Sequence, residues 1–131
     1  MQGTEQTDTI VLLDTDAQRL ELLLRDRAMA NHQYSSPLHD EIRKARIVKA
    51  DELPNDVVTM HSTVTILDIE DEETLTYTLV YPWEADADNR KLSILAPVGT
   101  ALIGYRTGDE IGWKVPGGVT RFRILSVSQD G

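Results

Sequence analysis

Residues 63 to 81, TVTILDIEDEETLTYTLVY, carry two strand patterns with an acidic turn between them. Val64 and Ile66 alternate with threonines, which is the spacing of a strand that buries one face. The acidic run Glu70 to Glu73 predicts a hairpin turn, and the β-branched and aromatic run Thr74 to Tyr81 predicts the returning strand. We therefore expect an antiparallel hairpin in this part of the chain.

The residues that follow predict further strands and one short helix. Glu84 to Asn89 is expected to be an acidic loop, and Lys91 to Leu95 a strand. Pro97 to Gly104 predicts one or two helical turns, whose glycines allow the helix to start and stop against the sheet. Two final strands flank the turn signal Pro116-Gly117-Gly118. Residues 57 to 131 thus predict a small antiparallel α+β domain.

The first part of the chain has helical spacing. Residues 16 to 30 predict a helix after an N-cap in Asp14-Thr15-Asp16. Its apolar side chains lie three and four residues apart and form one stripe: Ala17, Leu20, Leu24 and Ala28. The turn-rich segment Asn31 to Pro37 precedes a second helix, in which Leu38, Ile42 and Ala45 have the same spacing. Two helices joined by a short loop predict an antiparallel hairpin, here a short coiled coil.

These patterns divide the chain into three segments. Residues 1–9 form a polar tail that we expect to be disordered, and residues 10–52 form the helical hairpin. Glu52 to Asp56 interrupts the helical pattern and serves as a linker into the α+β domain, residues 53–131.

Charge and composition exclude several classes of function. The chain has 131 residues, with 13 Lys and Arg against 22 Asp and Glu, and a formal net charge of −9. Direct, sequence-specific binding to duplex nucleic acid is not expected as a primary role, because phosphates require clustered Lys and Arg. A basic protein partner suits such a chain better. The chain has no cysteine, which excludes disulfides, thiolate zinc sites and cysteine nucleophiles.

The same composition indicates where the protein resides. No apolar run approaches the roughly 20 residues of a membrane span. Met1 to Thr9 has neither the basic residues nor the apolar core of a secretory signal. We therefore expect a cytoplasmic protein that has no contact with membranes, and its small size and high charge favour a monomer.

Candidate catalytic groups are few. His32, His39 and His61 lack the i, i+4 spacing that puts two metal ligands on one helix face. The acidic run Asp68 to Glu73 lacks the glycine of a calcium loop, so we interpret it as a solvated hairpin tip. Residues 99 to 104 have the glycine spacing of a phosphate loop but no Lys-Ser or Lys-Thr after it. We expect neither enzymatic activity nor a metal or cofactor.

The two tryptophans have different expected roles. Trp113 lies within a predicted strand and is expected in the core. Trp83 follows Pro82 at the mouth of a loop, where an exposed aromatic ring is suited to anchor a partner. A structural role is the alternative for Trp83.

Several motifs in the second half occur in a familiar order. The block Lys91 to Gly104, KLSILAPVGTALIG, is followed by Gly108-Asp109-Glu110, by Pro116-Gly117-Gly118, and by a last strand that ends at Ile124-Leu125. In order and spacing, this part of the chain resembles the C-terminal domain of the bacterial transcript-cleavage factors GreA and GreB. Thr76 to Pro82, TYTLVYP, is similar to the Rnk branch of that family, named for regulation of nucleoside diphosphate kinase.

The resemblance covers about residues 10 to 128 and implies both a fold and a partner. The implied fold is a compact FKBP-like domain behind an N-terminal helical hairpin. The implied partner is RNA polymerase, bound near the secondary channel through which nucleotides enter. In the Gre proteins a Ser-Pro-Ile/Val segment helps make this contact. The matching residues are Ala96, which replaces the serine, Pro97 and Val98, with Leu102 nearby. A role in the core alone is the alternative for Val98 and Leu102.

The cleavage factors of this family deliver acidic residues to the polymerase's catalytic magnesium at the tip of a long coiled coil. A helix of about 15 residues spans only roughly 22 Å. The predicted tip, Asn31 to Pro37, contains no carboxylate. We therefore expect a polymerase-binding regulator that does not stimulate cleavage. Direct regulation of nucleoside diphosphate kinase and FKBP-like prolyl isomerase activity are the alternatives.

Overall fold

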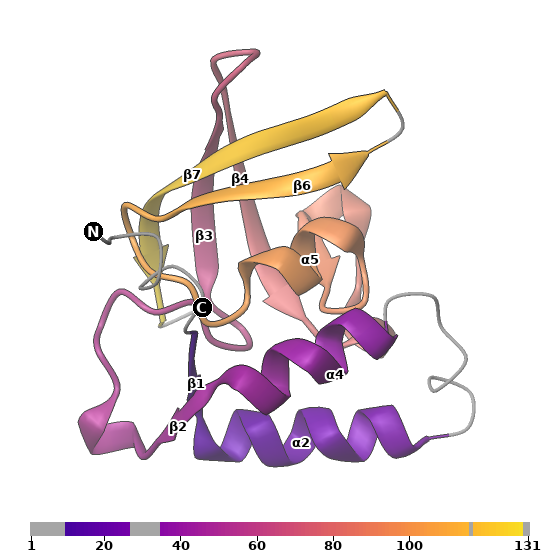
Figure 1. Ribbon diagram of the computed structural model, residues 1–131, viewed down its shortest axis with the longest axis vertical. Coiled ribbons are helices and arrows are strands. Elements are labelled where there is room, and N and C mark those ends of the chain that lie inside the picture. Colours follow the sequence, from indigo (N-terminus) through magenta and orange to yellow (C-terminus); the bar gives the residue numbers. More distant parts are fainter. Residues whose placement is uncertain (1–9, 27–34, 116, 130–131) are drawn as a thin grey trace.

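The computed structural model describes residues 10–26, 35–115 and 117–129 (Figure 1). The expected N-terminal tail and His32 lie outside the described residues, as does the predicted tip of the hairpin up to residue 34. The rest of that predicted tip is helical. The chain combines helices and a multi-stranded sheet, as the sequence predicts.

In the helical part, one very short strand precedes the first helix and another follows the second. Its elements are β1 (Val11–Leu13), α2 (Asp14–Arg25), α4 (Ser35–Lys44), β2 (Arg46–Val48) and the 3-10 turn η1 (Ala50–Glu52). The helices α2 and α4 lie side by side at one end of the sheet, and the chain reverses direction between them (Figure 1). β1 and β2 form a parallel pair, which the sequence analysis did not predict.

The first helix differs from its predicted limits. It begins at Asp14, after Leu13, and no side chain caps it; the Asp14 carboxylate instead accepts a hydrogen bond from the next backbone N–H. The helix ends at Arg25, because the backbone of Asp26 leaves the helical region with ψ 127°. The buried stripe contains Ala17 and Leu20 as predicted, but Leu23 is buried where Leu24 was expected to be.

The second part of the chain contains the sheet. Its strands are β3 (Thr63–Asp68), β4 (Glu73–Val80), β5 (Lys91–Ser93), β6 (Glu110–Val115) and β7 (Gly118–Ser128). The short helix is α5 (Pro97–Leu102), and the 3-10 turns are η2 (Pro82–Glu84) and η3 (Ala87–Asn89). The strands lie in the order β5-β4-β3-β7-β6.

The sheet is not wholly antiparallel, which corrects the prediction. β5 pairs with β4 in the parallel sense, with Thr78 opposite Lys91. Between these two strands the chain passes through η2 and η3, which return it only as far as Thr78, so that β5 runs beside the last three residues of β4. A parallel neighbour cannot be reached through a tight hairpin turn, and the segment that contains η2 and η3 supplies the crossover that it requires. The acidic loop predicted at residues 84 to 89 is part of this crossover.

One hydrophobic core connects the helical part to the sheet. The same cluster of buried side chains contains Leu20 of α2, Leu38 of α4, Leu102 of α5 and Ile66 of β3. Backbone hydrogen bonds reinforce the contact, because Val11 N–H donates to the carbonyl of Gly104 at 3.1 Å.

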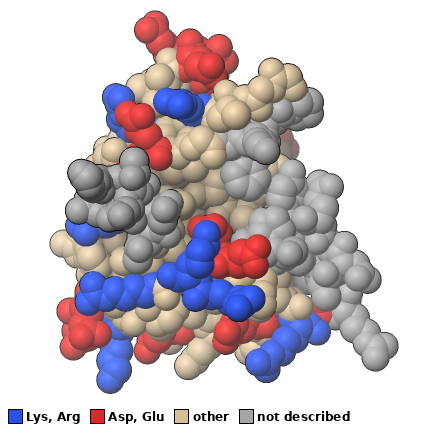
Figure 2. All heavy atoms as spheres, in the orientation of Figure 1, with Lys and Arg blue, Asp and Glu red and all other residues tan. Residues whose placement is uncertain are grey.

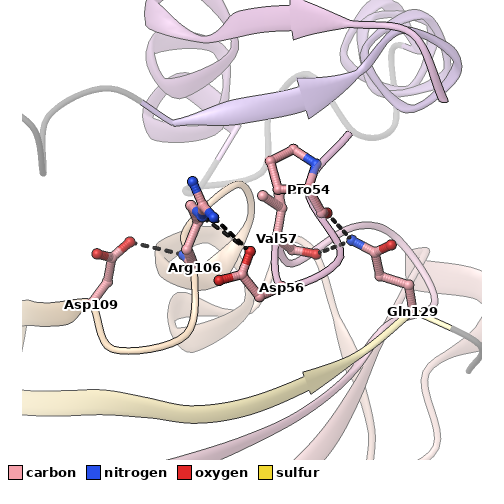
Figure 3. Close-up of polar contacts among 6 residues, drawn as sticks. All are labelled: Pro54, Asp56, Val57, Arg106, Asp109 and Gln129. Carbon is pink, nitrogen blue, oxygen red and sulfur yellow. Dashed lines mark hydrogen bonds and ion pairs between the residues drawn. The ribbon is translucent and has the colours of Figure 1, made fainter. Parts of the chain in front are cut away.

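Polar contacts also fix the segment that enters the sheet (Figure 3). The side-chain amide of Gln129, beyond the end of β7, donates to the carbonyls of Pro54 and Val57 at 2.9 and 2.8 Å. Asp56 in the same segment pairs with the guanidinium of Arg106 at 3.0 Å. The predicted linker therefore has a defined position against the sheet.

Candidate docking surface

The segment Ala96 to Val98 forms the entry to α5 and is held by hydrogen bonds within the chain. Ala96 N–H donates to the carbonyl of Ser93 at 2.9 Å, and the Ala96 carbonyl accepts from Thr100 N–H at 2.9 Å. Pro97 occupies the first turn of the helix, where its missing N–H has no consequence. Ala96, Pro97 and Val98 are each half-buried, so part of each side chain reaches solvent.

Two residues behind this segment explain why α5 sits so close to β5. The buried hydroxyl of Thr100 donates to the carbonyl of Ile94 at 2.6 Å. A Cβ on Gly99 would lie 2.2 Å from the carbonyl oxygen of Ser93, so only glycine permits this approach. The entry to α5 is thus a rigid edge.

Leu102 does not belong to this edge. Its side chain is only 1% exposed and packs in the hydrophobic core. The expectation that it helps to contact a partner is therefore corrected, because a side chain without accessible surface cannot make that contact. Val98 packs partly against the same core and keeps part of its surface accessible.

A groove of about 780 Å³ lies beside Ala96. Its other lining residues come from β4, the crossover and β5: Tyr77, Ala85, Asp86, Ala87, Asp88, Arg90, Lys91, Leu92 and Ser93. The carboxylate of Asp86 accepts hydrogen bonds from the Asn89 side chain at 2.7 Å and from Asp88 N–H at 3.2 Å. The Asn89 hydrogen bond is the main reason that the pKa of Asp86 is lowered. Both acidic and basic groups therefore border this groove, in a loop that its own hydrogen bonds keep ordered.

The structure places Trp83 in a different groove from Ala96. Trp83 belongs to η2, is 71% exposed and stacks on Tyr81, with ring centroids 5.2 Å apart and an interplanar angle of 5°. It faces α2 across a groove that Ala96 does not line. The two predicted contact points thus belong to two different grooves, and residues of the crossover segment line both. The side chain of Trp113 lies outside the described part of the structure.

The sequence did not predict a polar cluster that lies next to Trp83. Nε2 of His61 lies 2.8 Å from Oε1 of Glu84, and the same oxygen accepts a hydrogen bond from Tyr81 N–H at 3.1 Å. The hydrogen bond with His61 is the main reason that the pKa of Glu84 is lowered. His61 itself has a φ of 70°, which few residues other than glycine adopt. This positive φ depends on the fold, so no sequence pattern signals it.

Asp16 extends this cluster into the helical part. Asp16 is 7% exposed, and its carboxylate accepts a hydrogen bond from Met60 N–H at 3.0 Å. Burial raises the pKa of Asp16, and the hydrogen bond from Met60 partly offsets that effect. Burial also raises the pKa of the Tyr81 hydroxyl, and the nearby Arg19 guanidinium partly offsets that effect. Within the described residues this hydroxyl makes no hydrogen bond of good geometry. Asp16 thus ties the start of α2 to the segment before β3.

The acidic run between β3 and β4 forms a turn. One carboxylate oxygen of Asp68 accepts hydrogen bonds from the backbone N–H groups of Glu70 and Asp71, both at 3.2 Å. Within the described ranges, no three His, Asp or Glu side chains are grouped so as to hold a metal ion. Figure 2 shows this acidic turn at one end of the molecule. Lys and Arg side chains lie among Asp and Glu side chains over the helical end (Figure 2). Arg43 and Lys44 occupy the last turn of α4.

Comparisons with known proteins identify relatives of the whole chain. A family model described as "Transcription elongation factor, GreA/GreB, C-term" matches residues 53–129. The Escherichia coli K12 protein named "Regulator of nucleoside diphosphate kinase" is 42% identical over 120 residues, which are 91% of this chain and 88% of that protein. The solved structure titled "Prokaryotic transcription elongation factor GreA/GreB from Nitrosomonas europaea" aligns with a TM-score of 0.76 and 43% identity. That alignment covers 91% of this chain and 98% of the other.

Relatives named GreA match a smaller region. The transcription elongation factor GreA of Syntrophotalea carbinolica is 34% identical over 91 residues, which are 70% of this chain but 58% of that protein. The relatives are named as regulators or elongation factors rather than as enzymes. None of the described helices is long and apolar enough to cross a membrane.

Proposed function

Because the chain belongs to the GreA/GreB family of transcription elongation factors, we propose that it regulates transcription by binding RNA polymerase near the secondary channel. The contact is made by the rigid edge at Ala96, Pro97 and Val98 together with the groove beside it. In this proposal residues 53–131 form an FKBP-like domain, and a short helical hairpin precedes it. The protein acts as a monomer in the cytoplasm.

The observation that carries this proposal is the accessible entry to α5. Ala96 and Pro97 stand where the Gre sequence has its Ser-Pro motif, and both reach solvent from a hydrogen-bonded backbone. A preorganised apolar edge loses little conformational entropy when a partner binds. Ala96 supplies no side-chain hydrogen bond, so we expect the affinity to come from packing and from backbone groups.

The helical part supports a role without transcript cleavage. α2 has 12 residues and α4 has 10, so α2 spans about 18 Å at 1.5 Å per residue. The predicted tip of the hairpin, Asn31 to Pro37, contains no Asp or Glu. Such a hairpin offers neither the reach nor the tip carboxylates that the cleavage factors deliver to the polymerase's catalytic magnesium. We therefore propose that it occupies the site and competes with longer Gre factors.

Binding to core RNA polymerase tests the proposal. Saturable binding at physiological salt is expected, with displacement by a Gre factor. Ala96→Asp should weaken the affinity at least tenfold, because it places a charge in an apolar contact. Val119→Asp, which changes an exposed side chain of β7, is the matched control and should leave the affinity within twofold. If the wild type shows no saturable binding to polymerase, the proposal is wrong. Binding that a Gre factor does not displace would contradict the shared site.

The 42% identity to a protein named as a regulator of nucleoside diphosphate kinase favours a second candidate function. In that case the chain binds the kinase itself. The discriminating measurement is the rate of purified nucleoside diphosphate kinase with and without the protein. A change in rate without polymerase present supports direct regulation, whereas an unchanged rate leaves transcription as the route.

A further inference from the structure

A second groove, of about 460 Å³, lies between α2 and η2. Its lining residues come from the helical part and from the sheet part of the chain: Arg19, Leu22, Leu23, Asp26, His61, Tyr81, Trp83 and Glu84. Leu22 and Trp83, 64% and 71% exposed, are the two most exposed large apolar side chains of the described structure. Both line this groove, so its two walls present apolar surface to solvent.

The aromatic wall is fixed before any partner arrives. Trp83 stacks on Tyr81, whose ring is only 4% exposed, and the His61 ring packs edge-on against Tyr81 at 5.7 Å. Glu84 holds this arrangement through its hydrogen bonds with His61 and with Tyr81 N–H. A tryptophan supported in this way binds with a small loss of side-chain entropy. Exposed tryptophans in such positions often contribute most of the binding energy of an interface.

The charges of the groove select the kind of partner. Two carboxylates, Asp26 and Glu84, border it together with one guanidinium, Arg19, and with the His61 imidazole that hydrogen-bonds to Glu84. The whole chain carries a formal net charge of −9. A basic side chain fits this border better than an acidic one. A cation that lies against the exposed face of Trp83 also gains a cation–π interaction.

We infer that the groove receives a segment of RNA polymerase in which an apolar side chain stands next to an arginine or lysine. This inference rests on the proposed function and adds a second contact to the edge at Ala96. The apolar side chain packs between Leu22 and Trp83, and the cation lies near Asp26 and Glu84. Since α2 supplies one wall, the helical part takes part in docking even though it is too short to reach the catalytic magnesium.

Affinity for core RNA polymerase tests the inference with variants on both walls. Trp83→Ala and Leu22→Ser should each weaken the affinity at least fivefold, because each removes an apolar surface at the centre of the contact. Asp26→Asn should weaken it about two- to threefold at low salt and leave it unchanged at high salt, because screening removes the charge effect. Val119→Ser, on an exposed β7 side chain, is the control and should stay within twofold. All variants change exposed side chains, and circular dichroism checks that they fold.

The possible results separate the inference from the proposed function. Wild-type binding that Trp83→Ala and Leu22→Ser both leave unchanged overturns the inference, while the Ala96 edge keeps its role. Failure of the wild type to bind polymerase overturns the proposed function, and the inference with it. A dimer in sedimentation experiments that Trp83→Ala abolishes would assign the groove to a second copy of this chain and overturn the polymerase assignment.

Discussion

Asp16 is the residue whose environment is least evident from its neighbours in the sequence. Its carboxylate lies in the interior and accepts the hydrogen bond from Met60 N–H, 44 residues further along the chain. The replacement Asp16→Ala leaves this buried N–H without a partner. We expect it to lower the free energy of unfolding by about 1–3 kcal/mol. Urea denaturation at neutral pH measures the change, and Asp14→Asn, on the same turn of α2, is a control expected to stay within about 0.5 kcal/mol.

The pH dependence of stability gives a second view of the same carboxylate. Burial raises the pKa of Asp16 above 3.8, so ionisation of this group opposes folding. Its contribution is fully present below pH 3.8 and is lost as the pH rises through the raised pKa. Asp16→Asn keeps an acceptor for Met60 N–H and cannot ionise. We expect the free energy of unfolding of the variant not to show this loss as the pH rises. A variant whose pH profile equals that of the wild type would contradict the buried position.

Glu72 shows a conformational penalty that a single substitution can remove. Its φ of 55° lies in the left-handed region, where a residue with a Cβ is disfavoured. Glu72→Gly should raise the free energy of unfolding by about 0.5–1 kcal/mol. Glu73→Gly, at the start of β4, should instead lower it by a similar amount, because glycine weakens a strand. Thermal unfolding of the two variants compares them directly, and a lower Tm for Glu72→Gly would refute the assignment of strain.

The short helix α5 depends on glycine for its distance from β5. Gly99→Ala would place a Cβ 2.2 Å from the backbone oxygen of Ser93, which cannot move aside alone. We expect a loss of about 1–3 kcal/mol in unfolding free energy. Because α5 must shift, binding of polymerase through Ala96 should weaken as well. The matched control is Gly112→Ala in β6, where the new Cβ meets Val119 at an ordinary 3.5 Å. Equal stabilities of the two variants would show that the close approach is not required.

The elements that the sequence predicted are those with a strong local pattern. The alternation at Val64 and Ile66, the acidic turn and the proline at the start of α5 each identified an element that the structure contains. β1 and β2 were missed because three residues are too few to show a period. The parallel direction of β5 was missed because it depends on the path of the crossover through η2 and η3, whose short turns carry no periodic signal.

The candidate contacts were predictable only as separate residues. The exposure of Trp83 follows from its place after Pro82, and the motif around Pro97 marks the edge of α5. Their separation into two grooves could not be predicted, because it depends on where α2 packs against the sheet part. Leu102 was named as a contact only because it lies near the matching motif, and the structure buries it in the core.

The whole molecule is expected to unfold as one unit, since a single core joins the helices to the sheet. Helical circular dichroism reports mainly on α2 and α4, whereas fluorescence reports on Trp83 and Trp113 in the second part. The two signals should therefore change at the same denaturant concentration. Ile10→Ala removes a side chain that is 1% exposed and contacts this shared core. It should lower the free energy of unfolding by about 2–5 kcal/mol. Both midpoints should then move together to a lower denaturant concentration. Loss of the helical signal at a lower denaturant concentration than the fluorescence change would mean that the helical part is held more weakly. The groove at Trp83 would then lose its α2 wall before the sheet unfolds.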